Sequence, residues 1–341
     1  MNTVRLGKTE LVVSEVGFGG IPIIPLDFEE GVTVVRHCFE RGMTFFDTAN
    51  MYGDSEKKIG QALETVRDKV VIATKTLERS AEGAAKHIAY SLENLKTDYI
   101  DLYQLHSISK QDDLDKILAP GGALEAAEMA KSEGRIKHIG FSSHDVALAI
   151  KICRTGHFST LQIPFNFIES DPAAELFPVA QELDMGMIAM KPLGGGLLER
   201  ADLCFTFLQQ YPLVVPIPGI QSVAEGDEII QFYESPRPLR AKDAKKIDTI
   251  RAELGKRFCH RCGYCIPCEQ GVKIPEVLGF RTLARRLSPA ITIAFTKDAM
   301  QTVENCSECG ECLDKCPYRL PIPDLIKEYH AVFQDYVSKH G

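Results

Sequence analysis

The sequence lacks any long hydrophobic run. No segment approaches the roughly 18 consecutive apolar residues of a membrane-spanning helix, so we expect no membrane span. A basic excess is also missing, because the formal net charge is −8, and we expect no nucleic-acid partner. The opening residues, MNTVRLGKTE, show no apolar segment behind a basic flank, which argues against a signal peptide. These absences predict a cytoplasmic protein whose thiols stay reduced.

Cysteine is the informative residue in an otherwise ordinary globular composition, with 45% apolar and 25% charged residues. Eight of the eleven cysteines fall within residues 259–316. The other three, Cys38, Cys153 and Cys204, are scattered through helical patterns, and we expect them to be small buried side chains. The length of 341 residues suits one large domain and a smaller one.

Short apolar runs alternate with amphipathic stretches over residues 14–230, after a short hairpin that turns at Gly7-Lys8. The expected strands are Val16–Gly19, Thr44–Asp47, Val70–Thr74, Ile100–Leu105, His138–Ser142, Thr160–Ile163, Met187–Met190 and Val214–Ile217. The expected helices include Glu29–Arg41, Ser55–Val66, Ala81–Leu95, Gly122–Glu133 and Ala173–Leu183. Strands that alternate with helices predict a parallel sheet.

Eight such units predict an α/β fold, a (β/α)8 TIM barrel over residues 1–255. An open doubly wound sheet is the alternative, but it would more often show a glycine-rich dinucleotide turn after its first strand. A helical pattern at Ala241–Leu254 closes the barrel domain in this interpretation. The composition then changes to cysteine, glycine and proline, so residues 256–341 are expected to form a second, small, all-helical domain.

The second domain contains two runs of four cysteines. They are Cys259-x2-Cys262-x2-Cys265-x2-Cys268 and Cys306-x2-Cys309-x2-Cys312-x3-Cys316-Pro317. The second run has the spacing of bacterial ferredoxins, in which the fourth cysteine of each run ligates the other cluster. That rule assigns Cys259, Cys262, Cys265 and Cys316 to one [4Fe–4S] cluster, and Cys306, Cys309, Cys312 and Cys268 to the other.

The first run departs from the ferredoxin pattern, because its last gap is two residues and Glu269 stands where proline is expected. Helical patterns at Ile274–Leu287 and Ile291–Val303 separate the two runs, which resembles an all-helical two-cluster module. Two zinc sites are an alternative, although structural zinc more often uses paired CxxC motifs. Disulfides are disfavoured by the reducing compartment.

Four polar residues stand at or just after the ends of three neighbouring strands. They are Asp47, Tyr52, Lys75 and His106. The carboxyl ends of barrel strands open on one face, where TIM-barrel active sites lie. Each residue alone could serve packing or loop structure, but their positions at consecutive strand ends predict a shared catalytic site.

The segments around these residues resemble the aldo/keto reductase family. The likeness rests on Phe46-Asp47-Thr48-Ala49-x-x-Tyr52-Gly53, Ile72-Ala73-Thr74-Lys75, Asp101-Leu102-Tyr103-Gln104-Leu105-His106 and Ile139-Gly140-Phe141-Ser142-Ser143-His144. It runs over residues 1–230, and the cysteine-rich end is similar to a branch of the family with a ferredoxin-like extension.

The resemblance implies a role for each of the four residues. Tyr52 would donate a proton to the alkoxide formed when a nicotinamide cofactor delivers hydride to a carbonyl carbon. Lys75 would lower the pKa of that phenol, and Asp47 would hold Lys75 in place. His106, as a neutral imidazole, would orient the carbonyl oxygen.

The resemblance also implies a cofactor site, with NADP(H) or NAD(H) as the cofactor. Ser142, Ser143 and Gln162 align with positions that bind the nicotinamide carboxamide, and Met190 replaces a stacking tyrosine. Lys191 could meet a phosphate, and Gly219 lies in the turn after the eighth strand. The basic residue expected for a ribose phosphate is absent, because Glu225, Asp227 and Glu228 follow that turn. NADH, or weak nicotinamide binding, therefore stays open.

Two functions follow as hypotheses. The first is a nicotinamide-dependent carbonyl reductase or alcohol dehydrogenase, acting on a small molecule, that two clusters tune, stabilise or supply with electrons. The second is an electron-transfer protein that exchanges electrons with a ferredoxin or flavoprotein and turns over nicotinamide poorly. Clusters that act only as structural staples of a small domain are a further alternative.

Overall fold

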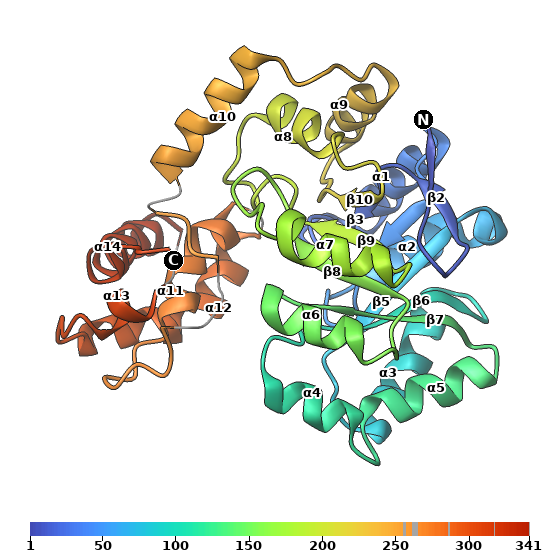
Figure 1. Ribbon diagram of the computed structural model, residues 1–341, viewed down its shortest axis with the longest axis horizontal. Coiled ribbons are helices and arrows are strands. Elements are labelled where there is room, and N and C mark those ends of the chain that lie inside the picture. Colours follow the sequence, from blue (N-terminus) through green and yellow to red (C-terminus); the bar gives the residue numbers. More distant parts are fainter. Residues whose placement is uncertain (255–256, 261–264, 286, 317, 341) are drawn as a thin grey trace. The chain divides into compact units, whose positions relative to one another are not determined.

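The computed structural model of the protein describes residues 1–254, 257–260, 265–285, 287–316 and 318–340 (Figure 1). The chain divides into two compact units: residues 1–194 with 198–239, and residues 195–197 with 240–341. Helix α10 (Ala241–Leu254), expected to close the barrel domain, belongs to the second unit. The boundary near residue 256 stays a prediction. Among the described helices, none is long and apolar enough to span a membrane.

A parallel sheet of eight strands forms the centre of the first unit, and the strands pair in chain order. They are β3 (Phe18–Gly19), β4 (Phe45–Asp47), β5 (Val71–Thr76), β6 (Ile100–Leu105), β7 (Ile136–Ser142), β8 (Thr160–Pro164), β9 (Gly186–Met190) and β10 (Val214–Ile217). The two outer strands also meet, because the Gly17 amide donates to Pro216 O at 2.9 Å and the Gly19 amide to Pro218 O at 2.8 Å. The sheet therefore closes, which confirms the predicted (β/α)8 barrel.

Helices follow the strands and lie outside the sheet (Figure 1). They are α1 (Phe28–Glu40), α2 (Ser55–Leu63), η1 (Glu64–Lys69), α3 (Ala81–Asn94), α4 (Gln111–Leu118), α5 (Ala123–Ser132), α6 (Val146–Arg154), α7 (Pro172–Glu182), α8 (Ala201–Leu208) and α9 (Val223–Glu234). Side-chain caps start three of them: Ser80 accepts from Gly83 N, Asp145 from Leu148 N and Ser222 from Glu225 N. Such caps satisfy amides that have no partner within the helix.

The predicted N-terminal hairpin is confirmed, with β1 (Thr3–Arg5) antiparallel to β2 (Val12–Ser14). Its fully buried Leu6 and Val13 pack with side chains from the early part of several barrel strands, among them Phe45, Val71 and Leu102. The hairpin therefore closes the amino end of the barrel with apolar side chains, and the opposite end is left for polar ones.

Strand periodicity decides which side chains face the barrel interior. Val71 and Leu102 belong to the apolar cluster inside the barrel, and successive inward positions lie two residues apart. Lys75 in β5, and Gln104 and His106 at β6, therefore point inward nearer the carboxyl end. Register supports this, because Lys75 pairs with Gln104 across the two strands.

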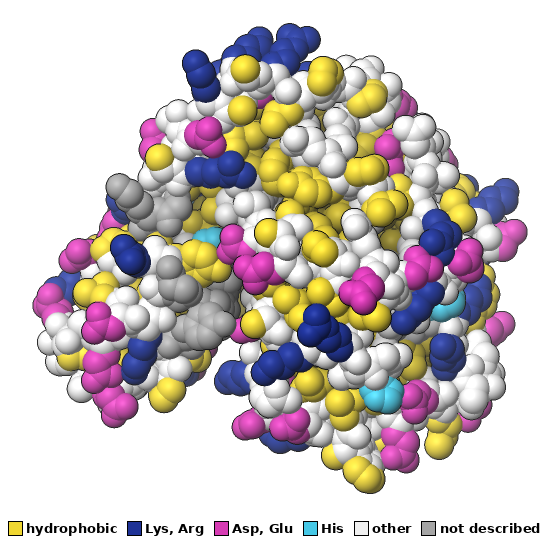
Figure 2. All heavy atoms as spheres, viewed as in Figure 1, with side chains coloured by type: hydrophobic (Ala, Val, Ile, Leu, Met, Phe, Trp, Pro, Cys, Tyr) yellow, Lys and Arg dark blue, Asp and Glu magenta, His cyan; other side chains and the backbone are white. Residues whose placement is uncertain are grey.

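The second unit is helical. Besides α10 it contains α11 (Ile274–Ala284), α12 (Pro289–Gln301), η2 (Thr302–Asn305), α13 (Glu311–Lys315) and α14 (Ile322–His340). Phe280 of α11 is 1% exposed, and its ring contacts Phe333 and Tyr336 of α14 at centroid distances of 5.3 and 5.5 Å. The two helices predicted between the cysteine runs are confirmed as α11 and α12. Across the visible face of the molecule, acidic and basic side chains are interspersed (Figure 2).

Candidate functional site

A buried ion pair lies at the carboxyl end of the barrel strands. Lys75 Nζ donates to Asp47 Oδ1 at 2.6 Å and to the backbone oxygen of Thr48 at 2.6 Å. The Lys75 side chain is fully buried and that of Asp47 is 4% exposed. Burial raises the pKa of Asp47, while the charge and hydrogen bond of Lys75 oppose that rise. Two charges removed from water in this way are stable only when they remain paired.

Two amide side chains complete the surroundings of Asp47. Gln104 Nε2 donates to Asp47 Oδ2 at 3.2 Å, and hydrogen bonding from Gln162 also lowers the pKa of that carboxyl. Sequence reasoning assigned no role to Gln104. The signal was a polar residue two positions before His106 and two after Leu102, which places it on the inward face of the strand.

Tyr52 lies in the loop after β4 and is half-buried. Its ring meets the His106 ring edge to face, with centroids 5.8 Å apart and an interplanar angle of 80°. Lys75 Nζ is 5.2 Å from the centroid of the Tyr52 ring. The structure therefore brings together all four side chains that were predicted to be catalytic.

His106 follows β6 and is 9% exposed. Burial, together with the positive charges of Lys75, Arg79 and Lys191, lowers the pKa of His106 to about 3. Its Nδ1 has no hydrogen-bond partner among the described residues. A neutral imidazole at this place can donate one hydrogen bond to an oxygen atom without carrying charge.

The predicted carboxamide-binding residues are all buried, but they differ in their contacts. Ser142 pairs with Gln162 across β7 and β8, and Ser142 Oγ accepts from the Ser107 amide at 2.8 Å. Ser143 Oγ instead accepts from the Asp145 amide at 3.1 Å within its own loop. Ser142 and Gln162 therefore lie near the ion pair, while Ser143 shapes the start of α6.

The other predicted cofactor residues lie at the ends of β9 and β10. Met190 and Lys191 are half-buried, and Lys191 has a left-handed φ of 57°. Lys191 Nζ lies 2.8 Å from His144 Nε2. Gly219 forms a parallel bridge with Gly19, where a Cβ on Gly19 would lie 2.8 Å from Pro218 O. Gly219 therefore takes part in closing the barrel.

Two of the acidic residues after the eighth strand have structural partners. Glu225 Oε2 accepts from the Gln221 amide at 2.7 Å, next to the Ser222 cap of α9. Asp227 contacts His37 of α1 at 2.9 Å and also pairs with Arg41, the residue that follows α1. Helix capping and helix packing therefore explain these two carboxylates without a nucleotide.

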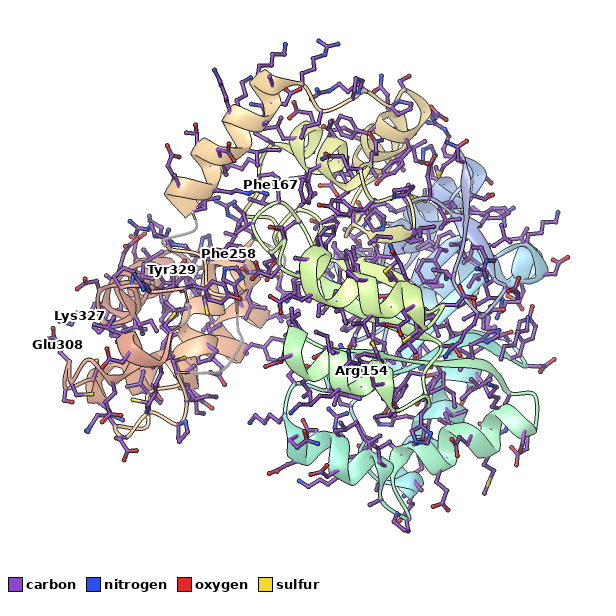
Figure 3. The ribbon with its side chains drawn as sticks, viewed as in Figure 1. Arg154, Phe167, Phe258, Glu308, Lys327 and Tyr329 are labelled. Atoms are coloured by element: carbon purple, nitrogen blue, oxygen red, sulfur yellow. The ribbon has the colours of Figure 1, made fainter. Side chains whose placement is uncertain are left out.

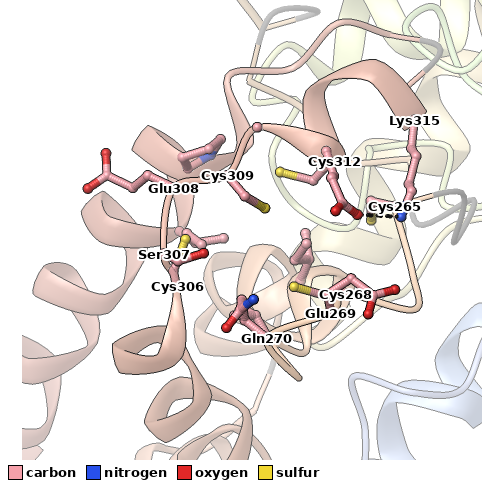
Figure 4. A pocket seen from close by; sticks show the side chains of 16 residues that line it. Cys265, Cys268, Glu269, Gln270, Cys306, Ser307, Glu308, Cys309, Cys312 and Lys315 are labelled. Carbon is pink, nitrogen blue, oxygen red and sulfur yellow. Dashed lines mark hydrogen bonds and ion pairs between the residues drawn. The ribbon is translucent and has the colours of Figure 1, made fainter.

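Five cysteines line one recess of the second unit: Cys265, Cys268, Cys306, Cys309 and Cys312. The sulfurs of Cys268, Cys306, Cys309 and Cys312 point into a common space (Figure 4). Burial raises the pKa of the Cys312 thiol, and so does the proximity of the other three. Cys309 is exposed. Cys268, Cys306, Cys309 and Cys312 are the four cysteines that were predicted to hold one cluster.

Charged side chains border this first recess. Glu308 lines it and pairs with Lys327 at 2.6 Å on the surface (Figure 3). Lys315 also lines it and pairs with Glu311 at 3.1 Å. Paired charges of both signs therefore surround the sulfurs.

Three cysteines line a second recess, which is mainly apolar. They are Cys259, Cys265 and Cys316, while Cys262 lies outside the described residues. The rings of His260 and Tyr318 stack in its wall, with centroids 3.7 Å apart and planes 9° apart. Cys265 borders both recesses. The described members of the second predicted ligand set therefore converge as well.

The donor chemistry in both recesses fits iron–sulfur clusters, which cysteine thiolates hold at their corners. Within the described parts of the chain, no three His, Cys, Asp or Glu side chains are grouped to hold a single metal ion. The three cysteines of the barrel unit are buried, as predicted, and burial raises the pKa of Cys38 and of Cys153 to about 12.

Comparisons with known proteins match both units. The profile of the aldo/keto reductase family matches residues 15–203, and that of a 4Fe-4S dicluster domain matches residues 258–321. The uncharacterized oxidoreductase YqkF of Bacillus subtilis is 29% identical over 213 residues, 58% of this chain and 67% of that protein. L-galactose dehydrogenase of Arabidopsis thaliana is 31% identical over 212 residues, 57% of this chain and 66% of that protein.

Solved structures agree with the fold. The holo form of aldo-keto reductase AKR11C1 from Bacillus halodurans has a TM-score of 0.64 and 25% identity, covering 73% of this chain and 96% of that chain. The chain spans about two thirds of the length of the two curated relatives. The chain therefore belongs to the aldo/keto reductase family and carries a C-terminal 4Fe-4S dicluster domain.

Proposed function

We propose that this oxidoreductase transfers hydride between a nicotinamide cofactor and a carbonyl or alcohol substrate, with Tyr52 as proton donor. The arrangement of Tyr52 and His106 around the buried Asp47–Lys75 pair carries this proposal. A bound nicotinamide cofactor would supply or accept the hydride. Ser142 and Gln162 would hold its carboxamide, because both are buried polar residues on adjacent strands and Gln162 Oε1 has no partner among the described residues.

Within this proposal each side chain has a physical task. A phenol has an ordinary pKa near ~10, too high for ready proton exchange at neutral pH. The ammonium of Lys75 favours the phenolate, and Asp47 holds that ammonium in place by a hydrogen bond of 2.6 Å. His106 is uncharged, so it orients the substrate oxygen by a hydrogen bond and does not compete with Tyr52 as an acid.

We further propose that the two cysteine recesses hold two [4Fe–4S] clusters, ligated by Cys259, Cys262, Cys265 and Cys316 and by Cys268, Cys306, Cys309 and Cys312. Clusters of this kind supply one-electron transfer. Thiolate ligands require reduced cysteines, which supports a cytoplasmic location. A small carbonyl or alcohol compound is the proposed substrate, and a ferredoxin or flavoprotein is the proposed redox partner.

Replacing Tyr52 with phenylalanine tests the catalytic proposal. Tyr52→Phe should lower nicotinamide-linked carbonyl turnover by at least about 100-fold, the usual contribution of a general acid, while the iron content stays unchanged. The matched control is Tyr90→Phe, because Tyr90 is 57% exposed on α3. Turnover that survives in Tyr52→Phe would remove Tyr52 as the proton donor.

The second candidate function is electron transfer without rapid nicotinamide turnover. It is favoured by Ser143, whose hydroxyl bonds within its own loop, and by the lack of a basic residue in the turn after β10 and in α9. Anaerobic titration with NADH and NADPH separates the two functions. Bleaching of the clusters at a rate comparable to substrate turnover supports a coupled reductase, whereas bleaching only by a reduced ferredoxin or flavoprotein supports electron transfer.

A further inference from the structure

Gln104 is a polar side chain buried inside the barrel, and a specific hydrogen-bond partner is needed to explain its burial. It is fully buried on β6, and its register partners are Lys75 on β5 and Gly140 on β7. A Cβ on Gly140 would lie 3.3 Å from Gln104 Cγ and 2.2 Å from Thr160 Oγ1. The glycine therefore leaves the space in which the Gln104 side chain lies.

The two oxygens of Asp47 are held by different donors. Lys75 Nζ donates a hydrogen bond to Oδ1 at 2.6 Å, and Gln104 Nε2 donates one to Oδ2 at 3.2 Å. An ionised carboxylate only accepts hydrogen bonds, so the amide nitrogen of Gln104 must face it. The amide oxygen of Gln104 is left buried without a hydrogen-bond partner among the described residues. This orientation leaves a buried acceptor unsatisfied, which indicates that the bond to Asp47 determines it.

We propose that Gln104 is a positioning residue, whose amide holds Asp47 Oδ2 so that Oδ1 stays on Lys75 Nζ. This inference rests on the proposed function, because its effect on catalysis passes through Lys75 to Tyr52. Gln162 also hydrogen-bonds to the Asp47 carboxyl, but without the Gln104 amide Oδ2 loses a donor, and the carboxylate can then rotate or take a proton. The Lys75 ammonium would then be buried without a fixed partner, and its influence on the Tyr52 phenol would weaken.

The test compares Gln104→Met with Gln104→Glu. Methionine fills a similar volume without a donor, so kcat should fall about tenfold with little change in KM, as expected for a lost hydrogen bond to a charged group. Glutamate donates to Asp47 only when it carries a proton. Gln104→Glu should therefore approach wild-type kcat at low pH and lose activity as the pH rises. The control is Gln61→Met, because Gln61 is exposed on the outside of the barrel and accepts a hydrogen bond from Lys96 there.

A second measurement does not depend on turnover. The ionisation of Tyr52 is followed by tyrosinate absorbance, as the difference between each variant and the same variant carrying Tyr52→Phe. In Gln104→Met the pKa of Tyr52 should rise by about one unit, because a less firmly held Lys75 favours the phenolate less.

Three outcomes overturn or separate the claims. Wild-type kcat and an unshifted Tyr52 titration in Gln104→Met overturn the role of Gln104. Equal, pH-independent losses in Gln104→Met and Gln104→Glu also overturn it, because they would indicate packing alone. If the wild-type protein shows no carbonyl turnover, the proposed function fails, while the Tyr52 titration still decides whether Gln104 positions the ion pair.

Discussion

The rings of Tyr52 and His106 meet edge to face at the carboxyl end of the barrel strands, with centroids 5.8 Å apart. A phenol that can release a proton thus lies beside an imidazole that stays neutral. This contact depends on two loops, because Tyr52 follows β4 and His106 follows β6. In the proposed mechanism, this pairing would separate proton donation by Tyr52 from orientation of the substrate oxygen by His106.

The neutral state of His106 predicts a specific pH dependence. Its pKa is lowered to about 3, so turnover should show no step near ~6.5, the ordinary histidine value. Between these two values the unfolded chain binds a proton that the folded protein does not. Stability due to this group is therefore complete above pH ~6.5 and is lost as the pH falls towards 3. In His106→Gln, the free energy of unfolding, measured with urea across that pH range, should depend less on pH than in the wild type. An unchanged dependence on pH would contradict the lowered pKa of His106.

Breaking the buried ion pair should damage both stability and turnover. Lys75→Met leaves the Asp47 carboxylate without its cation, and we expect a loss of about 3 to 5 kcal/mol in the free energy of unfolding. Adding Asp47→Asn should recover part of that stability but none of the turnover. The control is Lys96→Met, whose exposed contacts should contribute less than about 1 kcal/mol. Chemical denaturation and steady-state kinetics measure the two effects, and equal losses in both lysine variants would refute the expectation.

The two cysteine recesses predict that distant cysteines serve the same cluster. Cys316→Ala should perturb the cluster of Cys259 and Cys265, whereas Cys268→Ala should perturb that of Cys306, Cys309 and Cys312. Iron and sulfide analysis of anaerobic protein should show less of both elements in each variant, and electron paramagnetic resonance should show that different signals are lost. Cys204→Ala, in the barrel unit, is the control and should keep full iron content. Loss of the same signal in both variants would rule out this exchange of ligands.

Replacing Asp101, at the amino end of the barrel, should lower stability without affecting catalysis. Asp101 is 2% exposed and accepts from Arg67 at 2.7 Å, Lys137 at 2.9 Å and the Ile72 amide at 3.0 Å. Asp101→Ala should cost about 3 kcal/mol or more of unfolding free energy, because the buried Ile72 amide and the largely buried Arg67 lose their acceptor. The control is Asp98→Ala, because Asp98 is exposed and lies three residues earlier in the chain. This change should alter the free energy of unfolding by less than about 0.5 kcal/mol. A large change in kcat in Asp101→Ala, measured well below its unfolding temperature, would be unexpected.

Much of the barrel was predictable because apolar residues recur with different periods in strands and in helices. All eight strands were located, as β10 illustrates with the predicted bounds Val214–Ile217. The role of Gln104 was not predictable, because a polar residue within a strand does not by itself reveal its partner. Its contact with Asp47 joins residues 57 positions apart.

Local patterns along the chain were sufficient for the alternation of strands and helices, the residues at the strand ends and the two cysteine runs, because each depends on neighbours in sequence. Folding in three dimensions settled which distant side chains meet: Gln104 with Asp47, and Asp227 with His37. These contacts arise where strand register, barrel closure and helix packing bring distant segments together, and no local pattern encodes such distances.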